Sequence, residues 1–272
     1  MTGLGLTVEL GVHVLDEWGY LAGRDEDRLR DVNDALADDG VRAIIATRGG
    51  KGAYRIADLL DIQAATRDPK LVVGFSEITV LQLALLKECG LVGLHGAAWS
   101  VARHGQESAS SFESAAFTTS PVVISSDPTE PTSALTTSGH VSGRLIGGNQ
   151  DLLATAAGWA LPSLDGAILL LEAFNLRLGH IDRQLTMLTN SGALDNIVGV
   201  AVGQYTECGS DEMTRGGWNE IDVLRDRLAR LDVPILGGLP IGHGARPRAI
   251  PIGTSAVLDA DTATLTVDAA VR

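Results

Sequence analysis

The sequence predicts an α/β protein made of two α/β domains, residues 1–140 and 141–272. Short apolar runs rich in β-branched residues alternate with stretches of helical periodicity along the chain. Its 32 glycines supply tight turns, and 272 residues suffice for two hydrophobic cores. We expect a parallel sheet in the N-terminal domain and a mixed or β-rich sheet in the C-terminal domain.

In the first half, the expected helices span residues 25–39 and 78–89, and the expected strands span 41–47, 71–74 and 91–95. The helices end at Gly40 and Gly90, as helices commonly do. The strands are uninterrupted apolar runs, which is typical of buried parallel strands. Residues 108–142 are rich in Ser, Thr and Pro and predict irregular connections or short strands, with the domain boundary near their end.

In the second half, the expected helices span residues 151–160, 181–188 and 221–231, and the expected strands span 167–171, 197–202 and 234–236. No sequence repeat relates the two halves.

The composition excludes several classes of function. A formal charge of −13 without a basic cluster disfavours nucleic acid and anionic membranes as partners. Cys89 and Cys208 are the only cysteines, too few for a disulfide framework or zinc knuckle, which indicates a reducing compartment. The first residues lack the pattern of a signal peptide, and no apolar run is long enough to span a bilayer. We therefore expect a cytoplasmic protein.

Ser76 is the candidate nucleophile. In Gly74-Phe75-Ser76-Glu77 it lies at the sharp bend between a predicted buried strand and a helix, which exposes its hydroxyl. The second glycine of G-x-S-x-G is missing, and a serine in this position is more often a helix N-cap.

A serine hydroxyl needs a base, and His243 is the best placed of the six histidines. It lies between glycines in a loop after a predicted strand, where the imidazole stays uncovered. His95 also ends a strand, but a hydrogen-bonded structural role in the strand-end loops is expected for it. Glu172 follows the run AILLL and is the best candidate to orient His243, with a helix cap or an ion pair to Arg183 as the alternative.

The turn Arg48-Gly-Gly-Lys-Gly52 offers successive backbone N–H groups after a strand. It suits a carboxylate, an oxyanion or a phosphate. Its spacing matches neither the P-loop nor the dinucleotide fingerprint, so a nucleotide site is poorly supported.

Taken together, several motifs resemble the LD-carboxypeptidase family, which includes the microcin-immunity peptidases. They occur in family order over nearly the whole chain: GYLAGRDEDR at 19–28, RGGKG at 48–52, GFSEIT at 74–79, HG at 95–96, GGN at 147–149, LE at 171–172, IDR at 181–183 and GHG at 242–244.

The resemblance implies a Ser-Glu-His triad of Ser76, Glu172 and His243 at the interface of the two domains. It implies an oxyanion hole made by the backbone N–H of Glu77 and that of Gly50 or Lys51. The implied reaction passes through an acyl-enzyme without metal or cofactor. It releases the terminal D-alanine of a murein tetrapeptide during cytoplasmic cell-wall recycling, and the family forms homodimers.

The sequence departs from the family pattern in places. Phe75, Glu77 and Ala97 stand where tyrosine, aspartate and proline are common, and the motif after Glu172 lacks its second acidic residue. Relatives open with a strand, a small-residue loop and a helix before the segment that begins here at Leu6. We therefore expect either a late start or a domain with an open sheet edge.

Two alternatives remain. Within the family, an immunity-type peptidase would cleave a peptidyl-nucleotide antibiotic and stack its base on an aromatic residue, for which Trp99, Trp159 and Trp218 are candidates. From another class, a catalytically inactive module would bind a peptide carboxylate with the RGGKG turn.

Overall fold

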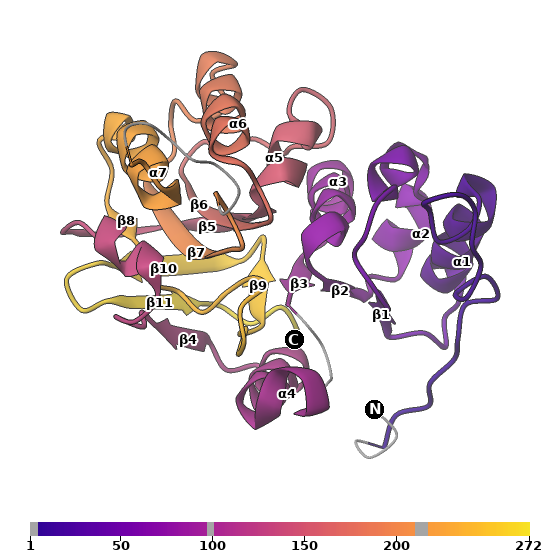
Figure 1. Ribbon diagram of the computed structural model, residues 1–272. Helices are drawn as coiled ribbons and strands as arrows, with labels where there is room; N and C mark the ends of the chain where they lie inside the picture. Colours follow the sequence, from indigo (N-terminus) through magenta and orange to yellow (C-terminus); the bar gives the residue numbers. More distant parts are fainter. Residues whose placement is uncertain (1–4, 97–100, 210–216) are drawn as a thin grey trace.

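The computed structural model describes residues 5–96, 101–209 and 217–272. Two β-sheets lie side by side, each accompanied by helices (Figure 1). The buried side chains of both sheets join one main hydrophobic core. The chain is therefore of the α/β class, as expected from its sequence.

The first sheet has four strands in the order β1-β2-β3-β9. These strands are β1 (Ala43–Ile45), β2 (Leu71–Gly74), β3 (Gly93–His95) and β9 (Ile250–Ile252). The first three are parallel, and β9 pairs antiparallel with β3. Its accompanying helices are α1 (Asp25–Ala37), α2 (Ile62–Arg67), α3 (Thr79–Cys89) and α4 (Val101–Phe117).

The second sheet has seven strands in the order β4-β11-β10-β5-β6-β7-β8. These strands are β4 (Val122–Ser125), β5 (His140–Asn149), β6 (Ala167–Phe174), β7 (Gly199–Thr206), β8 (Ile235–Leu236), β10 (Ser255–Asp259) and β11 (Thr264–Val267). The strands from β5 to β8 are parallel, whereas β4, β11, β10 and β5 pair antiparallel. The mixed sheet expected in the C-terminal half is confirmed.

Helices cover the parallel part of the second sheet. They are α5 (Gln150–Ala156), α6 (Leu178–Asn190) and α7 (Glu220–Leu228), and they lie together on one side of it (Figure 1). From Ala167 to Ala173 every residue of β6 is buried. A strand covered on both faces needs a continuous apolar run, which is what the sequence AILLL supplies.

A buried glutamine holds the first sheet to its helix. Gln82 of α3 is 2% exposed, and its side-chain amide lies within 3.0 to 3.3 Å of the carbonyl oxygens of Val72, Gly74 and Leu94. These carbonyls belong to β2 and β3, so one side chain fixes the helix against the strand that precedes Ser76. On the other face of the sheet, Phe112 of α4 packs in a small core with Val73 and Leu94.

Some expectations are wrong. The stretch 108–142, expected to be irregular or to form short strands, begins with ten residues of α4 and ends in the long strand β5, which starts at His140. Between them, the short strand β4 and irregular connections agree with the expectation. The antiparallel strands β9, β10 and β11 were not expected. The division near residue 140 stays a prediction, although β4 precedes it and joins the second sheet, while β9 follows it and joins the first.

At the N-terminal end, residues 5–11 form no strand, and the strand β1 lies at the edge of the first sheet. Cys89 and Cys208 are both free thiols. Within the described residues, no helix is both long and apolar enough to cross a bilayer.

Candidate active site

Ser76 lies on a strained bend at the end of β2. Its φ angle is 60°, in the left-handed region that residues other than glycine seldom adopt. Phe75 before it is extended, and a single 3-10 turn (Ser76–Ile78) leads into α3. A Cβ on Gly74 would lie 2.8 Å from a methyl carbon of Ile78, so the tight bend requires glycine there. This strand–turn–helix arrangement is that of a nucleophile elbow.

The RGGKG turn packs directly against the serine. A Cβ added to Gly49 would lie 3.1 Å from Ser76 Cβ and 3.3 Å from its Oγ. Gly50 and Gly52 have φ angles of 95° and 100°, which give the turn its shape. The Gly50 and Lys51 residues named by the sequence therefore belong to the turn that borders the serine.

The Glu77 side chain holds this turn in place. It is 2% exposed, and its Oε1 accepts the N–H of Ala53 at 2.8 Å. Burial raises the pKa of Glu77, and the N–H groups of Ala53 and Gly52 and the charge of Lys51 oppose that rise. Sequence reasoning assigned only the backbone N–H of Glu77 to the site, whereas its carboxyl group also orders the turn.

Glu172 is fully buried on β6, opposite Asn149 at the end of β5. The pairing of β6 with β7 shifts register between Leu171 and Ala173, where β7 carries one residue more than β6. Glu172 Oε1 accepts from Asn149 Nδ2 at 3.0 Å, and its Oε2 lies 2.7 Å from His243 Nδ1. No described bond joins it to Arg183, so the expected orientation of His243 by Glu172 agrees with the geometry.

His243 lies in the loop between β8 and β9, and both neighbouring glycines are needed there. A Cβ on Gly242 would lie 2.9 Å from Glu172 Oε2, and one on Gly244 would lie 2.2 Å from Gln204 Nε2. The Gly244 N–H donates to Gln204 Oε1 at 2.8 Å. The motif GHG thus lets the backbone approach two polar side chains closely.

Ser76 follows a strand of the first sheet, His243 lies in the loop that connects the two sheets, and Phe75 lies between them in contact with the histidine. The ring of Phe75 lies 4.8 Å from the imidazole of His243 between centroids. Among the hydrogen bonds of the described residues, none joins Ser76 to His243. Such bonds are often loose without substrate and tighten in the complex.

Several site residues were missed by sequence reasoning. Thr79 Oγ1 accepts the N–H of Asn149 at 3.2 Å and thereby links α3 to β5. Phe174 stacks on His243 with centroids 5.0 Å apart and ring planes at 20°. Asn149 stands at the end of a strand, opposite Glu172, and this position could have identified it as a site residue.

His95 differs from its expectation. It ends β3 fully buried, its ring meets Phe75 edge-on at 6.2 Å, and neither ring nitrogen has a hydrogen-bond partner among the described residues. Burial lowers the pKa of His95 to about 4, and the charge of Glu172 opposes this only in part. His95 is therefore neutral near pH 7, and it is not the bonded structural residue that was expected.

Two other features lie apart from these residues. His13, Asp16 and Asp27 have potential ligand atoms within 4.8 Å of one another, but the Arg30 guanidinium already donates to Asp27 at 3.1 Å. His13 lies in a turn at this place. We assign no metal to this group.

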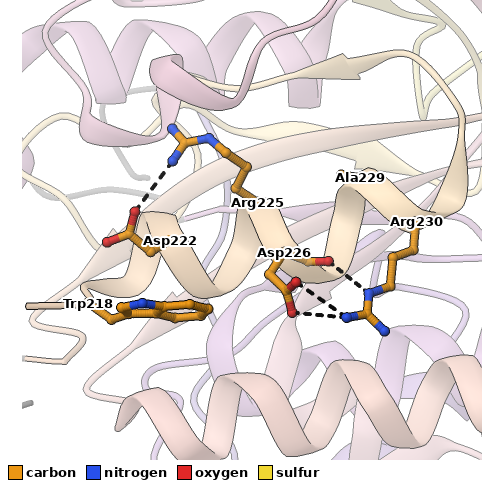
Figure 2. A pocket seen from close by; sticks show the side chains of 6 residues that line it. All are labelled: Trp218, Asp222, Arg225, Asp226, Ala229 and Arg230. Carbon is orange, nitrogen blue, oxygen red and sulfur yellow. Dashed lines mark hydrogen bonds and ion pairs between the residues drawn. The ribbon is translucent and has the colours of Figure 1, made fainter. Parts of the chain in front are cut away.

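A surface depression follows one side of α7 (Figure 2). Its lining consists of Trp218, Asp222, Arg225, Asp226, Ala229 and Arg230, and Figure 2 shows two acid–arginine pairs on this helix. None of the predicted triad residues lines it.

Comparison with known proteins places the chain in a family. Profiles of the LD-carboxypeptidase N-terminal and C-terminal domains match residues 1–96 and 142–258. The chain is 37% identical to the carboxypeptidase-named protein SCO6489 of Streptomyces coelicolor, over 98% of this chain and 86% of that protein. It is 33% identical to the murein tetrapeptide carboxypeptidase of Pseudomonas aeruginosa, over 94% and 84%.

Similarity extends to more distant relatives and to structures. The microcin C7 self-immunity protein MccF of Escherichia coli is 22% identical, over 91% of this chain and 80% of that protein. The crystal structure of muramoyltetrapeptide carboxypeptidase from Oxalobacter formigenes superposes with a TM-score of 0.80 at 27% identity, covering 93% of this chain and 87% of the other. The chain belongs to the LD-carboxypeptidase family and is a serine-type carboxypeptidase.

Proposed function

We propose that this protein hydrolyses the terminal L,D amide bond of murein tetrapeptides and releases D-alanine, with Ser76 as nucleophile, His243 as general base and Glu172 as its partner. The observation that carries the proposal is the 2.7 Å contact between His243 Nδ1 and a fully buried Glu172. The ring of Phe75, the residue before Ser76, contacts the same imidazole. The names of the relatives supply the substrate class.

In the first half of the reaction, Ser76 Oγ attacks the amide carbonyl carbon while its proton passes to His243 Nε2. Glu172 holds Nδ1 and stabilises the imidazolium that forms. The tetrahedral intermediate then loses the C–N bond, and His243 returns the proton to the amine of the departing D-alanine. The peptide remains as an ester on Ser76.

Water completes the reaction by the same route. His243 takes a proton from water, the hydroxide attacks the ester carbonyl, and the proton returns to Ser76 Oγ as the C–O bond breaks. In both halves, the N–H of Glu77 and that of Gly50 or Lys51 stabilise the oxyanion. The packing of Gly49 against Ser76 and the hold of the Glu77 carboxyl group on the turn support this assignment.

Phe75, directly after β2, contacts His243 in the loop after β8. Thr79, the first residue of α3, contacts Asn149 at the end of β5. These contacts support a site at the interface of the two sheets. In the proposed mechanism, substrate binding brings Ser76 Oγ to His243 Nε2 through a change in side-chain rotamer or in the relative position of the sheets.

The test is release of D-alanine from a murein tetrapeptide by the protein and by Ser76→Ala. Loss of the nucleophile is expected to lower kcat by about 10³- to 10⁶-fold, because only binding and oxyanion stabilisation remain. Circular dichroism controls for folding. A folded wild-type protein that releases no D-alanine would refute the proposed substrate.

The alternative substrate is a peptidyl-nucleotide, since MccF is among the relatives. Of the candidate tryptophans, Trp218 is 51% exposed on the depression of Figure 2, and Trp159 donates to the carbonyl of Thr155 and packs against the core. Trp99 lies outside the described residues. Hydrolysis of a peptidyl sulfamoyl nucleotide in place of the tetrapeptide would support this alternative.

The family resemblance also leads us to propose a homodimer that acts in the cytoplasm on recycled peptides. The two free thiols agree with a reducing compartment. Sedimentation of the purified protein tests the dimer.

A further inference from the structure

Phe174 occupies an unusual position for a phenylalanine. It is the last residue of β6 and is 42% exposed, although the seven residues before it in the strand are all buried. Its ring stacks on that of His243, at 5.0 Å between centroids and an interplanar angle of 20°. The face of the phenyl ring therefore lies against the face of the imidazole.

The strand geometry explains why Phe174 and Glu172 reach the same histidine. Residues two apart in a strand project to the same face of a sheet. Glu172 meets the imidazole at the Nδ1 edge, and Phe174 meets it at the ring face. Together they restrict both the direction of Nδ1 and the tilt of the ring, and with them the direction of Nε2.

An aromatic face also attracts a cation within about 6 Å of its centroid. The imidazole of His243 becomes such a cation when it takes the proton of the nucleophile. In its neutral state it gains only packing against Phe174. The contact is thus stronger in the protonated state, which is the kind of interaction that accelerates a reaction.

We propose that Phe174 is a positioning residue for His243, whose ring holds the imidazole in its productive orientation and stabilises the imidazolium; this rests on the proposed role of His243. The Phe75 ring, at 4.8 Å and 52°, gives the imidazole a second aromatic neighbour from the first sheet. Phe174 can be altered without touching the serine bend, which makes it the better residue to test.

The other groups facing His243 determine the background charge. Glu172 of β6 is the bonded carboxylate, and buried His95 of β3 is neutral near pH 7. Glu130 is held at 2.6 Å from the Gln204 side chain, which also bonds the His243 loop at Gly244. Arg246 of the same loop lies 3.7 Å from Glu107. None of these contacts involves Phe174, so its removal leaves them in place.

The experiment compares Phe174→Leu, Phe174→Tyr and a control, Phe117→Leu. Phe117 is similarly exposed, at 49%, at the end of α4, and its ring meets Phe112 instead of a histidine. The titration of His243 is followed by NMR of its ring protons, assigned by their absence in His243→Gln. Activity is measured in parallel as kcat and KM.

Phe174→Leu is expected to lower the proton affinity of His243 by about threefold to tenfold, because the imidazolium loses its aromatic face. The titration and the acid limb of kcat/KM then move to lower pH, while kcat falls by a similar factor and KM stays unchanged. Phe174→Tyr retains the wild-type titration and kcat, and Phe117→Leu changes neither.

A Phe174→Leu protein that titrates and turns over like Phe117→Leu overturns this inference. The NMR titration requires no substrate, so it decides the role of Phe174 even if wild-type protein releases no D-alanine. In that case the proposed substrate fails and the contact with His243 is judged separately. If Phe174→Leu does not fold, Phe174→Met is used with the same readouts.

Discussion

The two sheets differ in how firmly they hold their part of the site. The first sheet has strands of three or four residues, and its edge strand β1 has no fully buried residue. The second has strands of eight to ten residues in its centre, and β6 is buried almost throughout. Glu172 of the larger sheet is already bonded to His243 in the loop that follows β8, whereas Ser76 lies on a strained bend at the end of a strand of the smaller sheet. The proposed acid–base pair is thus preorganised, and the proposed nucleophile is the group that must move toward it.

The largest loss of activity in this series is expected from a substitution in β6, at the centre of the second sheet. Glu172→Gln should lower kcat by about 10³- to 10⁴-fold, because the amide cannot stabilise an imidazolium and favours the wrong tautomer. Steady-state D-alanine release measures it. Asp259→Asn, at the half-buried end of β10 in the same sheet, should leave kcat unchanged. Equal losses in both variants would show that the effect is one of folding.

His95 makes the smaller sheet sensitive to pH. Its pKa falls from the ordinary 6.5 to about 4 on folding, so between these values the unfolded chain binds the proton and the folded chain does not. The stability from this group is therefore complete above pH 6.5 and is lost progressively toward pH 4, by roughly 3 kcal/mol.

Urea unfolding at pH 7 and pH 4.5 measures this loss. His95→Leu should remove most of this pH dependence, while His140→Leu, at an exposed site on β5, should retain it. A His95→Leu protein with wild-type pH dependence would place the titrating group elsewhere.

Thr79 tests the bond between the sheets. It is fully buried, and its hydroxyl accepts the N–H of Asn149. Thr79→Val leaves that N–H without an acceptor and should lower the free energy of unfolding by about 1 to 3 kcal/mol. Thr79→Ser keeps the hydroxyl and should lose less, a difference that denaturant titration resolves. If serine loses as much as valine, the methyl group and not the hydroxyl carries the contact.

The smallest effect is expected at the exposed rim of the interface. Lys51 Nζ lies 3.9 Å from Asp151 Oδ2, and the two side chains are 59% and 39% exposed. A double-mutant cycle with Lys51→Gln and Asp151→Asn, measured on the free energy of unfolding, should give a coupling energy of about 0.2 to 1 kcal/mol that disappears at high salt. A larger coupling that persists at high salt would mean that the two sheets are locked together by charge.

Much of the fold followed from local patterns, and the failures have a common cause. Strands such as β2 and β6 are short, uninterrupted apolar runs, which is the pattern typical of buried parallel strands. In α4, by contrast, the buried positions include Ala109, Ala115 and Ala116 beside Phe112. Small side chains among serines give little periodic signal, so the helix was read as irregular. The hairpin of β10 and β11 was missed although its residues alternate in burial.

The candidate site was predictable where its residues lie in local sequence motifs. Ser76, Glu172 and His243 each stand at a strand end or in a glycine-flanked loop, and such positions can be recognised along the chain. Asn149, Thr79 and Phe174 act through neighbours that are distant in sequence. Their roles depend on β5 lying beside β6 and on α3 meeting the second sheet, which no local pattern specifies.

The path of the chain through β9 limits how such a protein can be recombined. The loop that carries His243 leads directly into β9, which returns to the first sheet and pairs with β3. On its other side, β3 pairs with β2, the strand that precedes Ser76. A chimaera that takes its C-terminal half from a relative therefore also receives one strand of its N-terminal sheet. The proposed base and that strand are therefore inherited together, and the strand must fit the β3 of the other parent.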